Sequence, residues 1–114
     1  MDLHEITARI EALSAQYAEV YGIDRSAEWA LLKLTEEVGE LAQAHLNASG
    51  QSRERGLDDA AKQQALRDEV GDVLGMCLVY AGQMGIDPVE AVTGKWFRYE
   101  RAAASEESTA PAGA

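Results

Sequence analysis

Two pairs of acidic residues, with a spacing of three residues in each pair, are the part of this sequence best suited to chemistry. Glu37 and Glu40 form one pair, and Glu69 and Asp72 form the other. Residues at i and i+3 are neighbours on a helix surface, so each pair can contact one ion if both segments are helical. Carboxylate oxygens favour hard cations, and we therefore expect these four residues to bind Mg²⁺, with Mn²⁺ as an alternative.

Apolar residues recur at steps of three and four along most of the chain, which predicts helices around both acidic pairs. The first helix is expected to end near Gly22. Asp24 or Ser26 suits the N-cap of the second helix, and Asp58 or Asp59 suits that of the third, because these side chains accept hydrogen bonds from free backbone N–H groups. No strand pattern competes with this interpretation, and the predicted fold class is all-α.

A fourth helix is predicted after Gly85. Asp87-Pro88-Val89-Glu90 resembles a helix start, with Asp as N-cap and Pro at the first helical position. The apolar stripe of this helix comprises Val89, Val92, Trp96 and Tyr99. Residues 105–114 offer nothing larger than alanine for a core and are expected to form a disordered tail. We expect one all-α domain over residues 1–104, followed by this tail.

The second and third helices are expected to pack as an antiparallel hairpin at the centre of a four-helix bundle, joined by a polar loop over residues 47–56. With 3.6 residues per turn, Glu37 lies roughly 80° and Glu69 roughly 60° from the centres of their apolar stripes. Both offsets have the same rotational sense. If the stripes pack against each other, the two acidic pairs therefore flank the seam on one face of the hairpin and converge.

The alternative is that these acids are solvated residues on amphipathic helices, which is the usual explanation of a single Glu-x-x-Glu. Two features favour a metal site. The acids flank the apolar seam, and the spacing is repeated on two helices. Clustered like charges are unfavourable, so a cation would stabilise the cluster.

Composition excludes several classes of function. Ten basic residues against twenty acidic ones give a net charge of −10, which disfavours nucleic-acid polymers and anionic membranes as partners. No apolar run approaches the roughly 20 residues that span a bilayer. The single Cys77 cannot form an internal disulfide, and no secretory segment is evident. We therefore expect a cytoplasmic protein.

The segment Lys33-Leu34-Thr35-Glu36-Glu37-Val38-Gly39-Glu40-Leu41, followed by Glu69-Val70-Gly71-Asp72-Val73, resembles the signature of the MazG-like nucleotide pyrophosphohydrolases. The later Lys95-Trp96-Phe97-Arg98-Tyr99 is similar to the basic and aromatic segment of that family. The resemblance covers about Trp29 to Tyr99. One departure is that many members carry an asparagine near Lys95, and this chain has none there.

The resemblance implies hydrolysis of a nucleoside triphosphate, an NTP or dNTP, to the monophosphate and pyrophosphate, serving to cleanse the nucleotide pool. It implies that Glu37, Glu40, Glu69 and Asp72 bind Mg²⁺. Glu40 or Glu36 would accept the proton of the attacking water, although Glu36 can equally be a solvated residue. The resemblance also suggests the substrate-binding residues Lys33, Lys95, Arg98 and Trp29.

Two other functions and two roles of Trp29 remain open. Phosphoribosyl-ATP pyrophosphohydrolase shares the all-α fold and an acid-rich site, and a non-catalytic helical module would use the acids as a docking face. Trp29 can stack on a base or lie in a core or interface.

Surplus apolar residues such as Leu32 and Leu74 further predict a homo-oligomer, a dimer or a tetramer.

Overall fold

The computed structural model of the chain describes residues 1–50 and 58–100. Within these ranges the protein is all-α, as predicted, with four α-helices and no strand. Helix α1 comprises Leu3–Tyr21, α2 Ala27–Ala48, α3 Asp59–Gln83 and α4 Pro88–Val92, and a π-helical segment, Thr93–Phe97, follows α4 directly. None of the described helices is long and apolar enough to cross a membrane.

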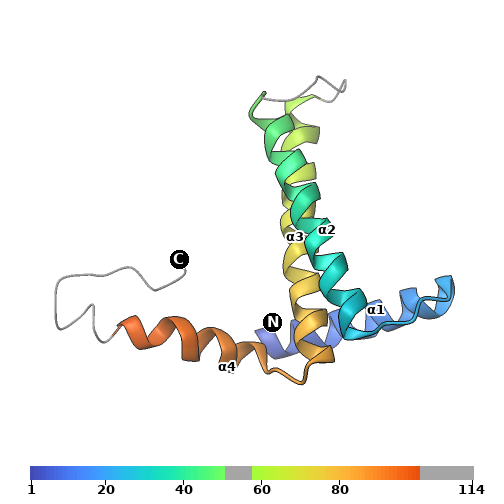
Figure 1. The fold of residues 1–114 in the computed structure, drawn as a ribbon. Coiled ribbons are helices and arrows are strands. Elements are labelled where there is room, and N and C mark those ends of the chain that lie inside the picture. Colours follow the sequence, from blue (N-terminus) through green and yellow to red (C-terminus); the bar gives the residue numbers. More distant parts are fainter. Residues whose placement is uncertain (51–57, 101–114) are drawn as a thin grey trace.

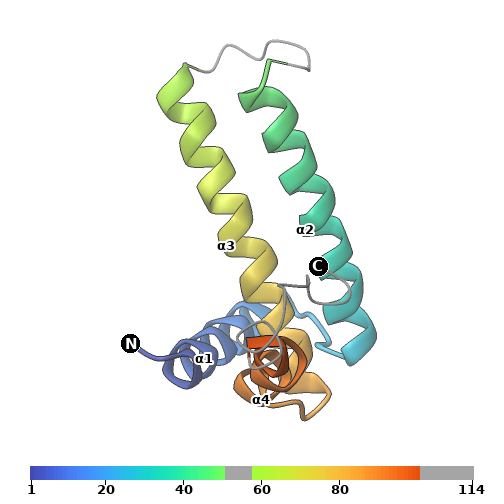
Figure 2. The ribbon, with the colours of Figure 1, turned by 90° about the vertical axis from the view of Figure 1, so that its left-hand side faces the viewer.

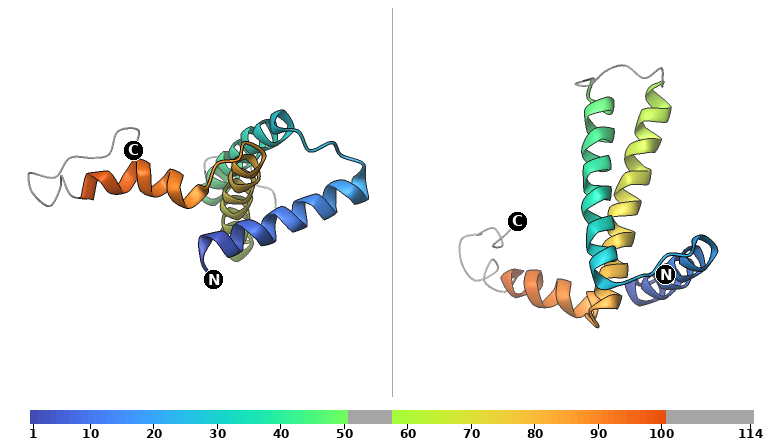
Figure 3. Two further views of the ribbon diagram at one scale, coloured as in Figure 1. Left: turned by 90° about the horizontal axis from the view of Figure 1, so that it is seen from below. Right: turned by 45° about the vertical axis from the view of Figure 1, so that its right-hand side comes forward.

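Helices α2 and α3 form a long antiparallel hairpin, the most extensive helix contact in the described chain (Figure 1 and Figure 2). We call the end formed by the start of α2 and the end of α3 the base of the hairpin, and the opposite end its tip. Helix α1 crosses the base and packs on α3. Helix α4 leaves the base and points away from the hairpin, with a small contact to α1 (Figure 3).

This arrangement corrects one prediction. The antiparallel central hairpin is present, but a single chain does not close a four-helix bundle. Helices α1 and α4 lie across the base rather than along the sides of α2 and α3 (Figure 1). The sides of the hairpin are therefore open to a further neighbour.

Short polar residues define the helix starts. Ser26, of the two candidates, caps α2 by accepting a hydrogen bond from Trp29 N at 3.0 Å, and Asp58 caps α3 by accepting one from Ala61 N at 2.7 Å. Asp87 caps α4 as predicted, through Val89 N at 2.8 Å. These caps satisfy N–H groups that the first turn of a helix leaves without partners.

Side-chain contacts tie α1 to the start of the hairpin and to the start of α4. Arg25, which precedes α2, pairs with Glu11 of α1, and its Nη1 also donates to Ser14 Oγ at 3.2 Å. His4, near the start of α1, lies 3.2 Å from the carboxylate of Asp87. The N-cap of α4 thus also holds the start of α1.

The π-helical segment was not predicted. The sequence indicated one regular helix with a stripe through Val92 and Trp96, but the backbone widens to π geometry over Thr93–Phe97. A π turn adds a residue to the turn and shifts the faces that follow it. Trp96, a member of the predicted apolar stripe, is 40% exposed, and Phe97 is 54% exposed.

The described chain has almost no core of large side chains. Five apolar residues are buried, four of them alanines: Ala18, Ala30, Ala44, Val79 and Ala81. Large apolar side chains remain exposed on the hairpin, including Leu32, Leu46, Val70 and Leu74. Exposed apolar surface of this extent is typical of interaction sites.

The seam between α2 and α3 lies to one side of the predicted stripes. Ala30 and Ala44, the buried residues of α2, are each seven residues from Glu37, and seven residues return to nearly the same helix face. Glu37 therefore lies on the seam itself. The stripe predicted on this helix comprised Leu31, Leu34, Val38, Leu41 and His45. Two of its members, Leu31 and Val38, are about half exposed. The apolar arc is wider than one neighbouring helix covers.

Two predictions fall partly or wholly outside the described residues. The loop expected over residues 47–56 begins later than predicted, because α2 continues to Ala48, and residues 51–57 are not described. The tail expected over residues 105–114, and with it the boundary of the domain at residue 104, also lies outside them.

Candidate metal centre

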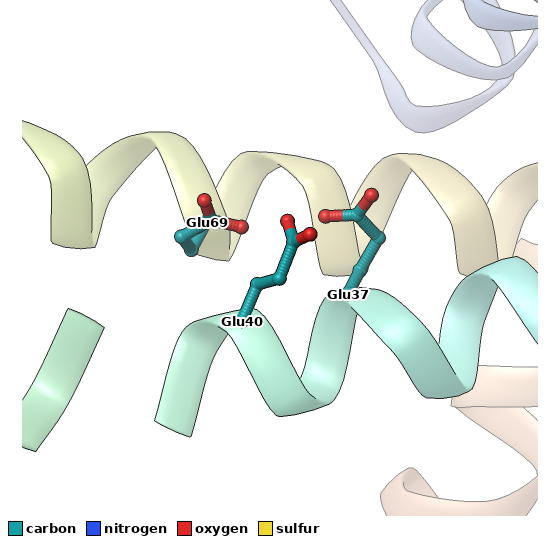
Figure 4. A group of neighbouring side chains, drawn as sticks. All are labelled: Glu37, Glu40 and Glu69. Atoms are coloured by element: carbon teal, nitrogen blue, oxygen red, sulfur yellow. The ribbon is translucent and has the colours of Figure 1, made fainter. Parts of the chain in front are cut away.

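Three of the four predicted ligands meet between the two helices of the hairpin. Glu37 and Glu40 extend from α2, and Glu69 extends from α3 towards them (Figure 4). One oxygen of each carboxylate lies within 4.8 Å of one oxygen of each of the other two. We call these three residues the carboxylate cluster. Its oxygens come from two facing helices, so an ion bound there would also join α2 to α3.

Two oxygens of the cluster are buried without any hydrogen-bond partner among the described residues. They are Glu37 Oε2 and Glu69 Oε2. A buried polar atom without a partner is unfavourable by about 1–3 kcal/mol, and more when it carries charge. An oxygen-binding cation fits this arrangement, because it would supply the missing partner to both atoms and offset the repulsion between the acids.

Burial and mutual repulsion both favour protonation in the cluster. Burial of the Glu37 carboxylate raises its pKa from 4.5 to about 7, with the charges of Glu40 and Asp72 adding to the rise. Burial likewise raises the pKa of Glu69, again with contributions from Glu40 and Asp72. A bound cation would reverse this balance and keep the carboxylates ionised.

Asp72, the fourth predicted ligand, lies beside the cluster rather than within it. It is one turn of α3 from Glu69, towards the base, and lines a cavity together with Glu37. Its charge contributes to the raised pKa of both Glu37 and Glu69. Asp72 therefore belongs to the electrostatic neighbourhood of the cluster.

Glu36 is not brought into the cluster. Its side chain is 56% exposed, and its Oε2 lies 3.4 Å from Lys33 Nζ, one turn earlier on α2. This is the solvated arrangement that the sequence left open for Glu36. Lys33, in contrast, lines the same cavity as Glu37 and Asp72.

That cavity is largely apolar and has a volume of about 520 Å³. It lies between α1, α2 and α3, on the side of the cluster that faces the base, and we call it the apolar cavity. Trp29 lines it, close to Lys33 and Glu37 in the same wall. Other members of its lining are Ile10, Leu13, Tyr17, Met76 and Val79.

A second cavity, of about 220 Å³, lies on the side of the cluster that faces the tip. Glu40 and Glu69 form its end at the cluster, and the remainder is lined by the polar residues Gln43, Asn47 and Lys62 together with Ala44 and Ala65. We call it the polar cavity. Sequence reasoning missed Gln43, Asn47 and Lys62. The available signal was the spacing of Glu40, Gln43 and Asn47, which places them on one face of α2.

Lys95 and Arg98, predicted at the phosphates, are not near the cluster within one chain. Lys95 lies in the π-helical segment, and Arg98 follows it. The guanidinium of Arg98 lies over the ring of Tyr99, 5.1 Å from its centroid, and Arg98 Nη2 donates to Tyr99 Oη at 3.2 Å. Neither basic residue lines the apolar or the polar cavity.

Comparison with known proteins identifies the family of this chain. Curated proteins and solved structures gave no significant match. The model of one family, the MazG nucleotide pyrophosphohydrolase domain, matches residues 25–100. The match spans two thirds of the chain and includes the carboxylate cluster and both helices that carry it. On this evidence the chain belongs to the MazG nucleotide pyrophosphohydrolase family.

Proposed function

We propose that this protein hydrolyses a nucleoside triphosphate, an NTP or dNTP, to the monophosphate and pyrophosphate in a reaction that requires Mg²⁺, with Mn²⁺ as a substitute. The observation that carries the proposal is the carboxylate cluster, with its two buried oxygens that have no partner, in a chain of the MazG family. Cleansing of the nucleotide pool in the cytoplasm is the role we assign to this activity.

Glu37, Glu40 and Glu69 would hold the cation, with Asp72 completing the negative environment. Bound Mg²⁺ supplies charge neutralisation at the phosphates and lowers the pKa of a coordinated water. Glu40 is the better of the two candidate general bases, because it belongs to the cluster whereas Glu36 is exposed and paired with Lys33. A carboxylate in this position can accept the proton of the attacking water.

The apolar cavity is the place we propose for the nucleoside. Trp29 and Tyr17 line it and offer aromatic faces to a base, and stacking on such faces contributes about 1–3 kcal/mol per base. Lys33 lies between Trp29 and Glu37 along α2, one turn from each. It can therefore reach the phosphate nearest to the sugar.

We further propose that the working form is a homo-oligomer, in which hairpins of two copies pack side by side into a four-helix bundle. The support is the exposed apolar surface of the hairpin, such as Leu32 at 70% and Leu74 at 61%. Closed two-fold symmetry is the usual solution for such a surface. In the assembly, α4 is free to bring Lys95 or Arg98 to the carboxylate cluster of a neighbouring copy, since it points away from its own hairpin (Figure 3).

The test is a screen of common and damaged nucleoside triphosphates with Mg²⁺, followed by detection of pyrophosphate. We expect release of pyrophosphate from at least one triphosphate by the wild-type protein and loss of it in Glu40→Gln. Glu19→Gln is the matched control, because Glu19 is an exposed glutamate of α1 remote from the cluster. Absence of hydrolysis across the screen would contradict the proposal and favour a non-catalytic module.

A further inference from the structure

The two cavities and the carboxylate cluster lie in a fixed order along the hairpin. The apolar cavity is nearest the base and is lined by Glu37 and Asp72 at its inner end. The polar cavity is nearest the tip and is lined by Glu40 and Glu69 at its inner end. The cluster therefore lies between a cavity lined mainly by apolar residues and one lined mainly by residues with polar side chains, and Figure 4 shows Glu37 on one side and Glu69 on the other side of Glu40.

The polar cavity has the chemistry of an anion site beyond the cluster. Lys62, partly buried in the first turn of α3, is the basic residue of its lining. Gln43 and Asn47 add side-chain amides, and Gln43 Nε2 donates to Asn47 Oδ1 at 3.2 Å. The capped start of α3, where Lys62 N donates to Asp58 O at 3.0 Å, holds Lys62 in this turn.

The distance from the carboxylate cluster to Lys62 and Asn47 suits a row of phosphate groups that starts at the cluster. Lys62 is seven residues from Glu69 on α3, and Asn47 is seven residues from Glu40 on α2. Seven residues of helix correspond to about 10 Å, part of which the lysine side chain spans. The volume of about 220 Å³ is several times the ~30 Å³ that one water molecule occupies. There is room for two phosphate groups.

We propose that the polar cavity is the subsite for the β- and γ-phosphates and that Lys62 binds the pyrophosphate as it leaves. This inference rests on the function proposed above. A triphosphate lying the other way round would have Lys33 near its first phosphates, but the phosphates beyond it would lie against Leu13, Met76 and Val79. Its base would lie among the polar side chains of Gln43, Asn47 and Lys62.

This placement assigns a role to each charge in the reaction. The water oxygen forms a bond to the α-phosphorus, and the bond between the α-phosphorus and the oxygen that bridges to the β-phosphorus breaks. The electron pair of that bond stays on the β-phosphate oxygen, and the water proton passes to Glu40. The ammonium group of Lys62 then faces the charge that develops on the leaving pyrophosphate.

Lys62→Gln tests the inference, with Lys62→Arg as the variant that keeps the charge. Arg67→Gln is the matched control, because it removes one positive charge from the same helix at an exposed position that lines neither cavity. The probes are inorganic pyrophosphate with Mg²⁺, and a nucleoside monophosphate with Mg²⁺, each measured by calorimetry and as a product inhibitor. Circular dichroism verifies the helical content of each variant.

We expect Lys62→Gln to weaken pyrophosphate binding at least about tenfold, the size of a lost charge-assisted hydrogen bond. Binding of the monophosphate, the Mg²⁺ requirement and the properties of Arg67→Gln should stay close to wild type, and Lys62→Arg should retain most of the pyrophosphate affinity.

Equal pyrophosphate affinity in Lys62→Gln and Arg67→Gln would overturn the inference. So would an equal loss of monophosphate binding, which would mark Lys62 as a support of the carboxylate cluster. Absence of triphosphate hydrolysis by the wild-type protein is a separate result. It would contradict the proposed function, whereas the comparison of Lys62→Gln with Arg67→Gln tests the role of Lys62.

Discussion

The buried charge of Glu37 gives the metal-free protein a specific dependence on pH. The unfolded chain releases the Glu37 proton near pH 4.5, whereas the folded protein holds it until about pH 7. The folded state therefore binds more protons between these values, and its stability falls as pH rises through this window and stays low above it. Glu37→Gln, which cannot ionise, should be free of this loss.

The size of the effect follows from the pKa. A tenfold change in a protonation equilibrium corresponds to about 1.4 kcal/mol, so a rise in the pKa from 4.5 to about 7 corresponds to at most about 3.5 kcal/mol. Solvent and counter-ions screen part of this at a site that is not fully enclosed. We therefore expect Glu37→Gln to stabilise the metal-free protein by about 1–2 kcal/mol at pH 8 and by much less at pH 5. In melting temperature this is several degrees.

The assay is thermal unfolding followed by circular dichroism at pH 5 and pH 8, in EDTA and in Mg²⁺, at one protein concentration. Glu19→Gln controls for the loss of one negative charge from an acidic protein. Added Mg²⁺ should stabilise the wild type at pH 8 and stabilise Glu37→Gln less, because a ligand that binds only the folded state adds to its stability. Equal stability of Glu37→Gln and Glu19→Gln in EDTA at pH 8 would show that the buried charge of Glu37 does not destabilise the metal-free protein.

Three further outcomes are expected. EDTA should abolish hydrolysis and Mg²⁺ or Mn²⁺ should restore it, because uncompensated carboxylates repel a triphosphate; full activity of metal-free protein would exclude the site. Glu40→Gln and Asp72→Asn should each lower kcat by at least about 10²-fold with helical content unchanged, and near wild-type rates in both would identify them as solvated residues. Sedimentation at micromolar concentration should give a mass of at least twice the 12.3 kDa chain, and an active species at the monomer mass would contradict the proposed assembly.

Local chemistry made the helix starts predictable. The caps at Ser26, Asp58 and Asp87 depend on one side chain and on backbone groups a few residues away, so the sequence holds all the information needed. The pairing of Glu37 with Glu40 was predictable for the same reason, since a spacing of three residues places two side chains on neighbouring positions of a helix.

Packing between helices was less predictable, because the apolar pattern indicates how much surface each helix buries but not which neighbour covers it. Leu31 and Val38 belong to the predicted stripe, yet they are about half exposed, and Ala30 and Ala44 are the buried residues of α2. The register of α2 against α3 was also unknown, and this hid Lys62, whose proximity to Glu69 and Asn47 appears only when both helices are placed together.

The proposed hydrolysis between the α- and β-phosphates is best tested by finding which bond of the triphosphate is cleaved. The measurement is ³¹P NMR of the products of Mg²⁺-dependent hydrolysis in water enriched in ¹⁸O, with a triphosphate identified in the nucleotide screen. We expect equal amounts of monophosphate and pyrophosphate, with the isotope in the monophosphate, because water attacks the α-phosphorus and pyrophosphate leaves towards Lys62. Release of orthophosphate and a nucleoside diphosphate, or recovery of the isotope in pyrophosphate, would contradict it.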